Sequence, residues 1–464
     1  MKFLGLLLTI PLLSGICLGQ AAQPTIPEEK PKPGQVIERI VCGANPGQTY
    51  ALYLPSNYSR NRSWPVVFAF DPGARGKVPV ELMKNAAEHY GYIVLGSNNS
   101  RNGPWKPEAD AADAMLRDAQ ERFSVDLKRI YFAGFSGGAR VASQLAQNCK
   151  CSAGVLLSGA GFSTNSSPQR DATFPVFSAV GTLDFNYREV IPLQDKLEQA
   201  GFPHWLRVFD GVHEWAPAAL MDEAFAWFRI QAMRENGEGR DEKFVSSELN
   251  RATAAAERYS TGGDSLSAWR QYKQITETYA GLAEVTELRT KADELAHAKA
   301  VQDALKHERS DFAEQERLSG QILGALQSKE VSETPRSYEQ SSALQDVRDL
   351  RQRSESEKKP ERAVVLKRAL AGIFVGAMES GSSALDEKDF QLATRFFSAA
   401  AEARPEAEWP LRQLAVAQAL GRDRKAAIET LKKAKTKTRD PAEFSTWVQN
   451  EPAFSDLRAR REVP

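Results

Sequence analysis

The chain has 464 residues, no formal net charge at pH 7 and 26% charged residues. This length is too great for one hydrophobic core and predicts two or three domains. The neutral balance argues against nucleic acid as the main partner, because phosphate binding needs a basic surface. No His and Cys residues stand at metal-ligand spacing, and we expect neither a metal nor another cofactor.

The N-terminus has the pattern of a secretory signal peptide over residues 1–22. Met1 and Lys2 precede an apolar run from Phe3 to Leu13, which is too short to span a bilayer and contains Pro11. No later apolar run is long enough to cross a membrane, and we expect a secreted or periplasmic protein without a membrane span. Residues 23–34, rich in Pro, Glu and Lys, are expected to form an extended linker.

Strand and helix signals alternate from residue 35 to residue 234. Apolar, β-prone runs predict strands at 36–41, 49–54, 65–70, 92–95, 130–133, 153–157, 174–180 and 206–209. Helical periodicity is found at 80–89, 107–123, 139–146, 191–199 and 216–233. This alternation predicts an α/β domain with a doubly wound, mostly parallel sheet that is covered on both faces.

A Gly-Phe-Ser-Gly-Gly motif at residues 134–138 joins the strand at 130–133 to the helix that follows. Its Gly-x-Ser-x-Gly pattern is typical of a nucleophile elbow, a sharp turn that lifts the hydroxyl of Ser136 above the sheet at a helix N-terminus. Side chains at Gly134 or Gly138 would collide with the neighbouring strand and helix. A glycine-rich turn with an idle serine is the alternative, and the strand–helix context favours the elbow.

Two residues further along the chain can activate Ser136. A serine hydroxyl needs a base to take its proton, and the base needs an acid to orient it. Asp184 and His213 each follow a predicted strand at the sheet edge where such sites form, in the order Ser, Asp, His. Of the five histidines only His213 is so placed, and Asp210, three positions before it, would have difficulty reaching its Nδ1 side.

Acyl transfer also needs two donors for the oxyanion of the tetrahedral intermediate. The amide of Gly137, directly after the nucleophile, is the first candidate. The second should lie in the loop after the strand at 65–70, where Pro72 has no N–H and Gly73 or Ala74 must therefore supply the donor.

Other side chains near these loops are candidates for contacts with the substrate or with the loops themselves. Trp105 and Trp215 are candidates for lining a substrate pocket, although core or rim packing is an equally good reading. Asp71 would put a negative charge near the developing oxyanion, and Arg75, four residues on, is the cation expected to pair with it.

The mature chain keeps three cysteines, Cys42, Cys149 and Cys151. An odd number in an oxidising compartment leaves at least one thiol unpaired. Cys149 and Cys151 flank a single residue, so a bond between them would be strained, and we expect no disulfide.

The composition shifts near Glu235, beyond which β-prone runs vanish and helix-forming residues dominate. We expect a helical region at 240–352 and a second helical domain at 361–464, with polar breaks near 328–337 and 353–360. Because all the candidate site residues precede this shift, we expect a chain ending near Glu235 to fold alone and to remain active.

One internal repeat lies in the second helical domain. A small-large-small pattern recurs at an offset of 34 residues, at Ala393, Phe397 and Ala400 and again at Ala427, Leu431 and Ala434. With Pro405 closing the first unit, this pattern resembles the tetratricopeptide repeat (TPR). A plain amphipathic helical bundle remains the alternative, above all for residues 240–350.

The motifs of the first domain together resemble those of the α/β-hydrolase superfamily. They are Tyr50 to Pro55, the elbow, Gly-Thr-Leu-Asp184 and Gly-Val-His213-Glu-Trp, and the resemblance is greatest to secreted esterases related to polyhydroxybutyrate depolymerases and feruloyl or acetylxylan esterases. It implies Ser136 as nucleophile, His213 as base and Asp184 as orienting acid. Those families usually carry His-Gly after the third strand, where this chain has Asp71-Pro72.

The sequence therefore predicts a secreted serine esterase that cleaves small or polymeric carboxylic esters, with a TPR-like helical domain that binds a protein partner. A scaffold in which a non-catalytic hydrolase domain and the repeats only bind is the alternative from another class. A peptidase on the same fold is a further alternative. The Ser, Asp, His order favours the enzyme, and Asp71-Pro72 favours the scaffold.

Overall fold

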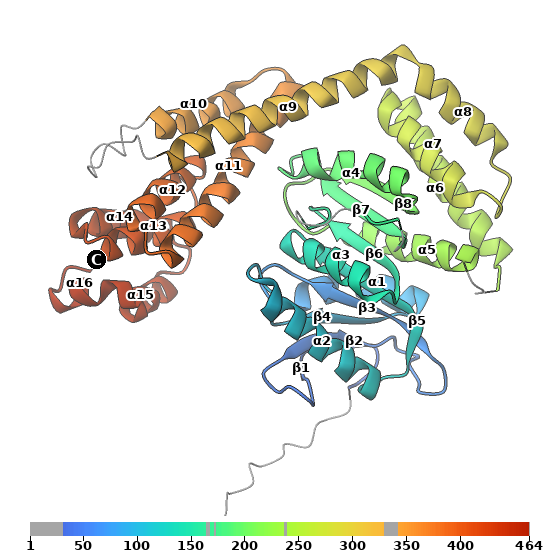
Figure 1. Ribbon diagram of the computed structural model, residues 1–464, viewed down its shortest axis with the longest axis horizontal. Helices are drawn as coiled ribbons and strands as arrows, with labels where there is room; N and C mark the ends of the chain where they lie inside the picture. The colour runs from blue at the N-terminus through green and yellow to red at the C-terminus, as the bar shows by residue number, and fades with distance from the viewer. Residues whose placement is uncertain (1–30, 164–167, 171–172, 236–238, 329–341, 464) are drawn as a thin grey trace, which may run out of the picture. The chain divides into compact units, whose positions relative to one another are not determined.

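The computed structural model describes residues 31–163, 168–170, 173–235, 239–328 and 342–463 (Figure 1). The predicted signal peptide, most of the predicted linker and most of the polar break at 328–337 lie outside the described residues. From Pro33 onward the chain forms one compact unit. Among the helices of the described ranges, none is both long and apolar enough to cross a membrane.

Within the described residues, the first half of the chain builds one eight-stranded sheet. Its strands are β1 (Val36–Val41), β2 (Thr49–Tyr53), β3 (Trp64–Phe70), β4 (Ile93–Ser97), β5 (Val125–Phe135), β6 (Ser152–Ser158), β7 (Val176–Gly181) and β8 (His204–Phe209). The spatial order is β1-β2-β4-β3-β5-β6-β7-β8, antiparallel at the pairs β1/β2 and β2/β4 and parallel elsewhere. The predicted mostly parallel sheet is confirmed.

Helices cover both faces of the sheet, because parallel strands need crossover connections (Figure 1). The helices are α1 (Lys77–Tyr90), α2 (Trp105–Arg122), α3 (Gly137–Cys149), α4 (Tyr187–Ala200) and α5 (Ala218–Glu235). Successive side chains of β5 point to opposite faces: Tyr131 packs into the core with α1 and α5, and Phe132 packs into the core with α2, α3 and α4. The sheet is therefore doubly wound.

Among the described residues of the second half of the chain, all regular secondary structure is helical. Its helices are α6 (Glu242–Thr261), α7 (Ser265–Tyr279), α8 (Thr286–His297), α9 (Lys299–Gln327), α10 (Ser342–Ser356), α11 (Pro360–Asp386), α12 (Phe390–Ala403), α13 (Trp409–Leu420), α14 (Arg424–Lys437), α15 (Pro441–Asn450) and α16 (Ser455–Ala459). The core beside α5 continues through Val245 of α6 and Ile275 of α7. Apolar packing therefore does not stop at the composition shift near Glu235.

Helix α7 protects the free edge of the sheet. Strand β8 pairs with β7 on one side only, which leaves backbone groups of its other side without a strand partner. The Leu206 amide donates to Oε1 of Gln274, and Nε2 of Gln271 donates to the Leu206 carbonyl at 3.4 Å. Both glutamine side chains are buried, and they occupy the two backbone groups of Leu206 with which another strand could otherwise pair.

Three helix pairs, α6–α7, α11–α12 and α13–α14, are joined by the same turn. In each, a residue with positive φ precedes an Asp whose amide bonds to the carbonyl five residues back and whose carboxylate accepts the amide three residues on. These pairs of residues are Gly263 and Asp264, Lys388 and Asp389, and Arg422 and Asp423. The turns at Asp389 and Asp423 follow the 34-residue period of the sequence, and the six repeat positions that the sequence predicts are buried.

The expectation that the chain has no disulfide is wrong. Cys149 and Cys151 are bonded to each other, and Cys42 is a buried free thiol. Cys149 is the last residue of α3, and Lys150 after it takes the left-handed conformation with φ 47° and ψ 13°. This turn folds the chain back until the two Cα atoms are 5.1 Å apart, within the usual range for a disulfide.

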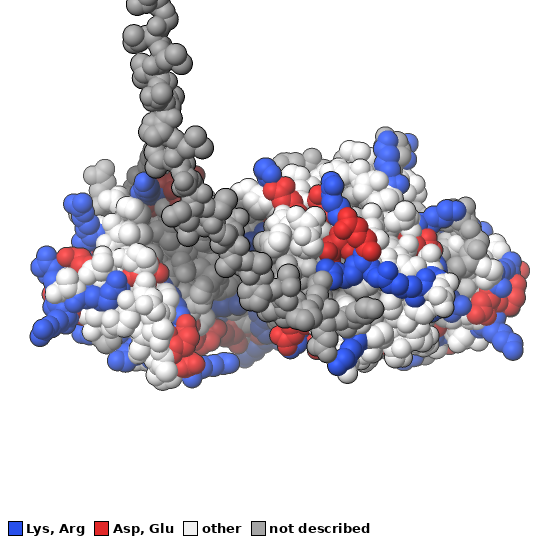
Figure 2. Space-filling view, turned by 90° about the horizontal axis from the view of Figure 1, so that it is seen from below, with Lys and Arg blue, Asp and Glu red and all other residues white. Residues whose placement is uncertain are grey.

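Acidic and basic side chains are mixed on the surface. On the face that Figure 2 shows, Lys and Arg alternate with Asp and Glu over the visible area instead of gathering by sign.

Candidate active site

The sharp turn predicted at Ser136 lies between β5 and α3. Ser136 has φ 53° and ψ −121°, a strained conformation for an L-residue, and its side chain is partly exposed. A Cβ at Gly134 would lie 2.0 Å from the Gly138 carbonyl oxygen, and one at Gly138 would lie 2.0 Å from the carbonyl oxygen of Phe70. Both glycines are therefore required by the close approach of strand, turn and helix.

Ser136, His213 and Asp184 form a continuous line of hydrogen bonds. Oγ of Ser136 lies 2.9 Å from Nε2 of His213, and Nδ1 of His213 lies 2.9 Å from Oδ1 of Asp184. Because the carboxylate can only accept, Nδ1 carries the proton, and Nε2 is left as the acceptor for the serine hydroxyl. The three residues predicted from separate loops thus meet at the carboxyl edge of the sheet.

Two aromatic rings hold the imidazole in place. The ring centroid of His213 lies 4.6 Å from that of Phe135 and 4.3 Å from that of Phe185, and the His213 side chain is 18% exposed. Phe185 directly follows Asp184, so one short loop supplies both the carboxylate and one of the packing rings. The sequence analysis missed Phe185, whose only signal is this position next to the acid.

The competing acid, Asp210, has another partner. Its Oδ1 accepts a hydrogen bond from Oγ1 of Thr182 at 3.3 Å, and the residue is exposed. Asp184, in contrast, is fully buried, and its Oδ1 also accepts the amide of Asn186 at 2.8 Å. The structure therefore pairs His213 with the residue that the sequence favoured.

Both amides predicted as the second oxyanion donor are engaged in closing their own turn. The Gly73 amide donates to Oδ1 of Asp71 at 2.9 Å, and the Ala74 amide donates to the Asp71 carbonyl at 3.0 Å. Ala74 has φ 57°, which allows this tight turn after β3. Neither amide is free in the structure, because the side chain and the carbonyl of Asp71 accept both of them.

The expected ion pair of Asp71 and Arg75 is present. Nε and Nη2 of Arg75 donate to the two carboxylate oxygens of Asp71 at 2.8 and 3.0 Å, and Nε1 of Trp215 donates to Oδ2 at 2.8 Å. Burial alone would raise the pKa of Asp71. The hydrogen bonds from Arg75, Trp215 and Gly73 outweigh it, so the pKa of this carboxyl lies below its usual value.

Replacing Arg75 with methionine should lower the free energy of unfolding at pH 7 by about 1 to 2 kcal/mol. The loss is limited because the Arg75 side chain is 59% exposed. A carboxylate with a lowered pKa stabilises the fold above its unfolded-state pKa, and this contribution is lost as the pH falls through the folded-state pKa. The difference from wild type should therefore shrink below about pH 4, as urea unfolding at both pH values can measure.

Arg117→Met is the matched control for this variant. Arg117 forms an i,i+4 pair with Asp113 in which both side chains are mostly exposed, and its removal should cost less than about 0.5 kcal/mol. An equal loss for Arg75→Met at pH 7 and at acid pH would contradict the assignment, because the missing interaction would then not depend on a charged Asp71.

The two tryptophans proposed as substrate contacts differ in their surroundings. Trp215 is only 7% exposed, packs 5.8 Å from the ring of Phe135 and donates to Asp71, as the core-packing alternative expects. Trp105 is the first residue of α2 and is 41% exposed. Trp215 therefore fixes the Asp71 loop, and no contact of the described residues brings Trp105 to Ser136.

The side chain of Asn102 lies against the elbow and was missed from the sequence. A Cβ at Gly137 would lie 1.8 Å from Oδ1 of Asn102, so the carboxamide occupies the space that a side chain there would need. Among the described residues, the Gly137 amide has no hydrogen-bond partner. The only signal for Asn102 in the sequence is its place on the loop after β4, at the carboxyl edge of the sheet.

A carboxylate of the helical half lies near the site. Glu379 of α11 interacts electrostatically with Arg140 and His213. Although the residue still contacts solvent, partial burial raises the pKa of Glu379, and the two nearby groups oppose the rise. Arg140 itself forms a bidentate pair with Glu189 at 2.8 Å and donates to the Phe162 carbonyl.

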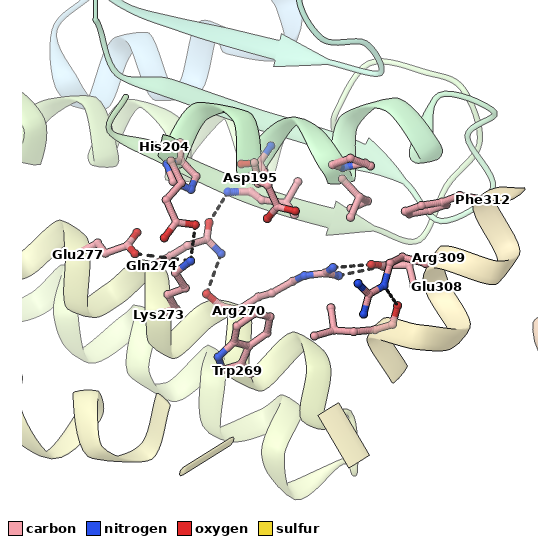
Figure 3. Close-up of a pocket in the computed structure, with 16 residues that line it drawn as sticks. Asp195, His204, Trp269, Arg270, Lys273, Gln274, Glu277, Glu308, Arg309 and Phe312 are labelled. Carbon is pink, nitrogen blue, oxygen red and sulfur yellow. Dashed lines mark hydrogen bonds and ion pairs between the residues drawn. The ribbon is translucent and has the colours of Figure 1, made fainter. Parts of the chain in front are cut away.

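A cavity of about 350 Å³ lies elsewhere, between α4, β8, α7 and α9 (Figure 3). No candidate site residue lines it. Its charged groups largely pair with one another, as in the bidentate pair of Arg270 with Glu308 and the contact of Lys273 with Glu198. Across the described ranges, no group of three or more His, Cys, Asp or Glu residues could hold a metal ion.

No family model and no curated protein matches this chain. Among solved structures, it is similar to the fluorophosphonate-binding serine hydrolase FphF of Staphylococcus aureus, with 13% identity, a TM-score of 0.35 and coverage of 42% of this chain and 98% of the other. A ferulic acid esterase has 17% identity and a TM-score of 0.36, and the match covers 42% of this chain and 97% of the esterase. A hyperthermophilic esterase from the archaeon Pyrobaculum calidifontis has 13% identity and a TM-score of 0.35, and the match covers 44% of this chain and 87% of the esterase.

At these identities and TM-scores the similarities carry no argument about activity. The strand order, the mostly parallel sheet and the elbow after β5 match the α/β-hydrolase fold. Repeat geometry in the C-terminal helices and membership of a particular esterase family do not follow from this match.

Proposed function

We propose that the protein is a serine hydrolase that cleaves carboxylic esters through an acyl-enzyme. Ser136 is the nucleophile, His213 the general base and Asp184 the acid that orients it. The observation that carries this proposal is the unbroken line from the serine hydroxyl through both ring nitrogens to a buried carboxylate. No cofactor is needed for this chemistry.

In the first step, Oγ of Ser136 attacks the ester carbonyl carbon while its proton passes to Nε2 of His213. Asp184 stabilises the imidazolium through the Nδ1 hydrogen bond, and the rings of Phe135 and Phe185 keep its orientation. The tetrahedral intermediate collapses when Nε2 returns the proton to the leaving alkoxide, which releases the alcohol. Water then attacks the acyl-enzyme by the same route, releasing the acid and restoring Ser136.

The oxyanion of this intermediate is stabilised by the Gly137 amide and, in our proposal, by Nδ2 of Asn102, whose carboxamide must turn for this because Oδ1 is the atom nearer Gly137. The Gly137 amide has no partner among the described residues and lies at the N-terminus of α3, where the helix dipole favours negative charge. Asn102 takes the place of Gly73 and Ala74, whose amides bond to Asp71. A side-chain carboxamide can serve as an oxyanion donor and is typically worth a factor of about 10² to 10³ in rate.

Labelling with a fluorophosphonate probe tests the proposal, because only an activated serine reacts. We expect folded protein to be labelled on Ser136, as located by peptide mass spectrometry, and heat-denatured protein to stay unlabelled. Asn102→Ala should react about a hundredfold more slowly than wild type while keeping its fold. Labelling of wild type and Asn102→Ala at the same rate would remove Asn102 from the oxyanion site.

A non-catalytic scaffold is the second candidate, and the engagement of the Gly73 and Ala74 amides favours it. A hydrolase domain without a second oxyanion donor could still bind an ester or a peptide without turning it over. Absence of labelling in folded protein, together with no hydrolysis of p-nitrophenyl esters, would decide for this candidate.

The location and the helical half complete the proposal. Secretion or export to the periplasm rests on the N-terminal pattern, and the Cys149–Cys151 bond suits an oxidising compartment. The two equal turns at Asp389 and Asp423, 34 residues apart, support TPR-like repeats at 361–464, to which we assign the binding of a protein partner. The substrate is a small or polymeric ester.

A further inference from the structure

The loop that carries Asp184 is held by two side chains from the helical half. Nε of Arg368, in α11, donates to the Thr182 carbonyl at 2.6 Å. Nε2 of Gln315, in α9, donates to the Phe185 carbonyl at 2.7 Å. These carbonyls lie on either side of Asp184 in the chain, so the two helices bind the backbone of the loop that carries the acid.

Both gripping side chains are buried. Gln315 is 2% exposed and Arg368 is 7% exposed. Within the described part of the chain, Arg368 has no carboxylate within 4.0 Å. Its Cζ instead lies 3.5 Å from the ring centroid of Tyr187, and burial lowers its pKa. Interactions with Tyr187, Asp311 and Glu308 oppose this lowering of the pKa, and burial outweighs them. The buried guanidinium is thus held by the Tyr187 ring and the Thr182 carbonyl.

Two further contacts fix the same loop and the start of α4. A Cβ at Gly372 of α11 would lie 3.5 Å from the Cβ of Phe185, so the helix backbone packs closely on that residue. The hydroxyl of Tyr187 donates to Oε1 of Glu308 at 3.3 Å, and Glu308 pairs with Arg270 of α7 on the cavity wall in Figure 3. Helices α7, α9 and α11 therefore all contribute to this anchorage.

The side chain of Asp184 has few other restraints, whereas the loop backbone is also held by bonds of the Thr182 and Leu183 amides to the carbonyls of Phe209 and Gly211. His213 and the Asn186 amide both bond to Oδ1 of Asp184, and Oδ2 is buried without a hydrogen-bond partner among the described residues. The direction of the carboxylate is thus determined mainly by the backbone of the loop. A shift of that backbone would move Asp184 and the Phe185 ring together, and both contact the imidazole.

We propose that Arg368 and Gln315 are positioning residues of the reaction, which hold the Thr182–Phe185 loop so that Asp184 and Phe185 orient His213. The hydrolase site is then complete only with α9 and α11. This inference rests on the proposed function, and it assigns to the helical half a role in the chemistry in addition to partner binding.

The test uses Arg368→Met and Gln315→Met, which keep an unbranched apolar stem and remove the donors, in the full chain. For p-nitrophenyl acetate we expect kcat to fall about ten- to a hundredfold, with KM within about threefold, because a misaligned base slows the chemical step. Arg368→Lys, which keeps a donor, should lose less than Arg368→Met. The downfield imidazole proton of His213, observed by NMR, should weaken or shift in both Met variants.

Arg395→Met is the matched control. Nη1 of Arg395 donates to the Ser328 carbonyl at 2.6 Å, so this residue also links helices through a carbonyl but does not touch the loop. Its kcat and imidazole signal should equal those of wild type. An equal fall in kcat for Arg395→Met would overturn the inference, because general loosening of the helices would then explain the effect.

Other outcomes separate this inference from the proposed function. If wild type is active and both Met variants keep kcat within twofold, the inference is wrong and the function stands. If wild type is neither labelled nor active, the function fails, and an unchanged imidazole signal in the variants then overturns the positioning role as well. If Arg368→Met does not fold, Gln315→Met and Arg368→Lys decide by the same measurements.

Discussion

Replacing Ser136 with alanine should lower the rate of p-nitrophenyl ester hydrolysis by about four to six orders of magnitude. The hydroxyl is the only group of this residue that reaches Nε2 of His213, at 2.9 Å, and an alanine leaves the base without a nucleophile to activate. The far-UV circular dichroism should not change, because the strained turn depends on Gly134 and Gly138.

Ser445→Ala is the control for this variant. Ser445 lies on the exposed side of α15, and within the described ranges its hydroxyl bonds to the Pro441 carbonyl alone, at 2.8 Å. This variant should keep full activity. If Ser136→Ala kept half the wild-type rate, Ser136 would not be the nucleophile, and the hydrogen-bonded line would have only a structural role.

A chain that ends after Glu235 should be insoluble or inactive. Helices α6 and α7 cover apolar surface of α5, where Trp227 donates to Oγ1 of Thr278 at 3.1 Å, and the truncation would expose it. Each large side chain returned to water costs about 1.5 to 3 kcal/mol, and a few of them equal the total stability of about 5 to 15 kcal/mol. This reverses the sequence-based expectation that the first domain folds and works alone.

A chain that ends after Ala403 is the control, because it loses α13 to α16 but keeps Gln315 and Arg368. Repeat-like helices contact mainly their neighbours, so this shorter loss should leave the sheet, the Asp184 loop and ester hydrolysis intact, although it uncovers the face of α12 that packs on Leu414 and Ala417. Solubility, circular dichroism and activity of both chains give the comparison. A soluble, active chain ending after Glu235 would show that neither the shared core nor the grip on the Asp184 loop is needed.

The features that were predictable from the sequence are those with a local signature. The alternating apolar runs predicted the parallel sheet, and the glycines around Ser136 predicted the turn. Asp184 and His213 could be found because each directly follows a strand, and parallel strands end at the same edge of a sheet. This topology predicts that the two side chains share an edge, and the hydrogen-bond distances come from the structure.

The features that escaped prediction depend on one backbone angle or on distant partners. The Cys149–Cys151 bond forms because Lys150 is left-handed, which composition does not reveal. The amides of Gly73 and Ala74 are engaged because the Asp71 side chain turns back on its own loop.

Long-range contacts left no signal at all. Arg368 and Gln315 lie 186 and 130 residues from the carbonyls that they bind, and neither stands in a motif. The composition shift near Glu235 marks the change from sheet to helix. It does not mark the end of the hydrophobic core, which continues from α5 into α6 and α7. A boundary in composition therefore did not mark a boundary in packing.

The glutamines of α7 that close the β8 edge have a consequence for synthesis of the protein. Leu206 and Gln274 are 68 residues apart, so the ribosome needs roughly 3 to 14 seconds between them at about 5 to 20 residues per second. During this interval β8 can already join the sheet while its outer edge is open to any extended chain nearby. The nascent protein is therefore most prone to strand exchange between copies after the sheet forms and before α7 has been made.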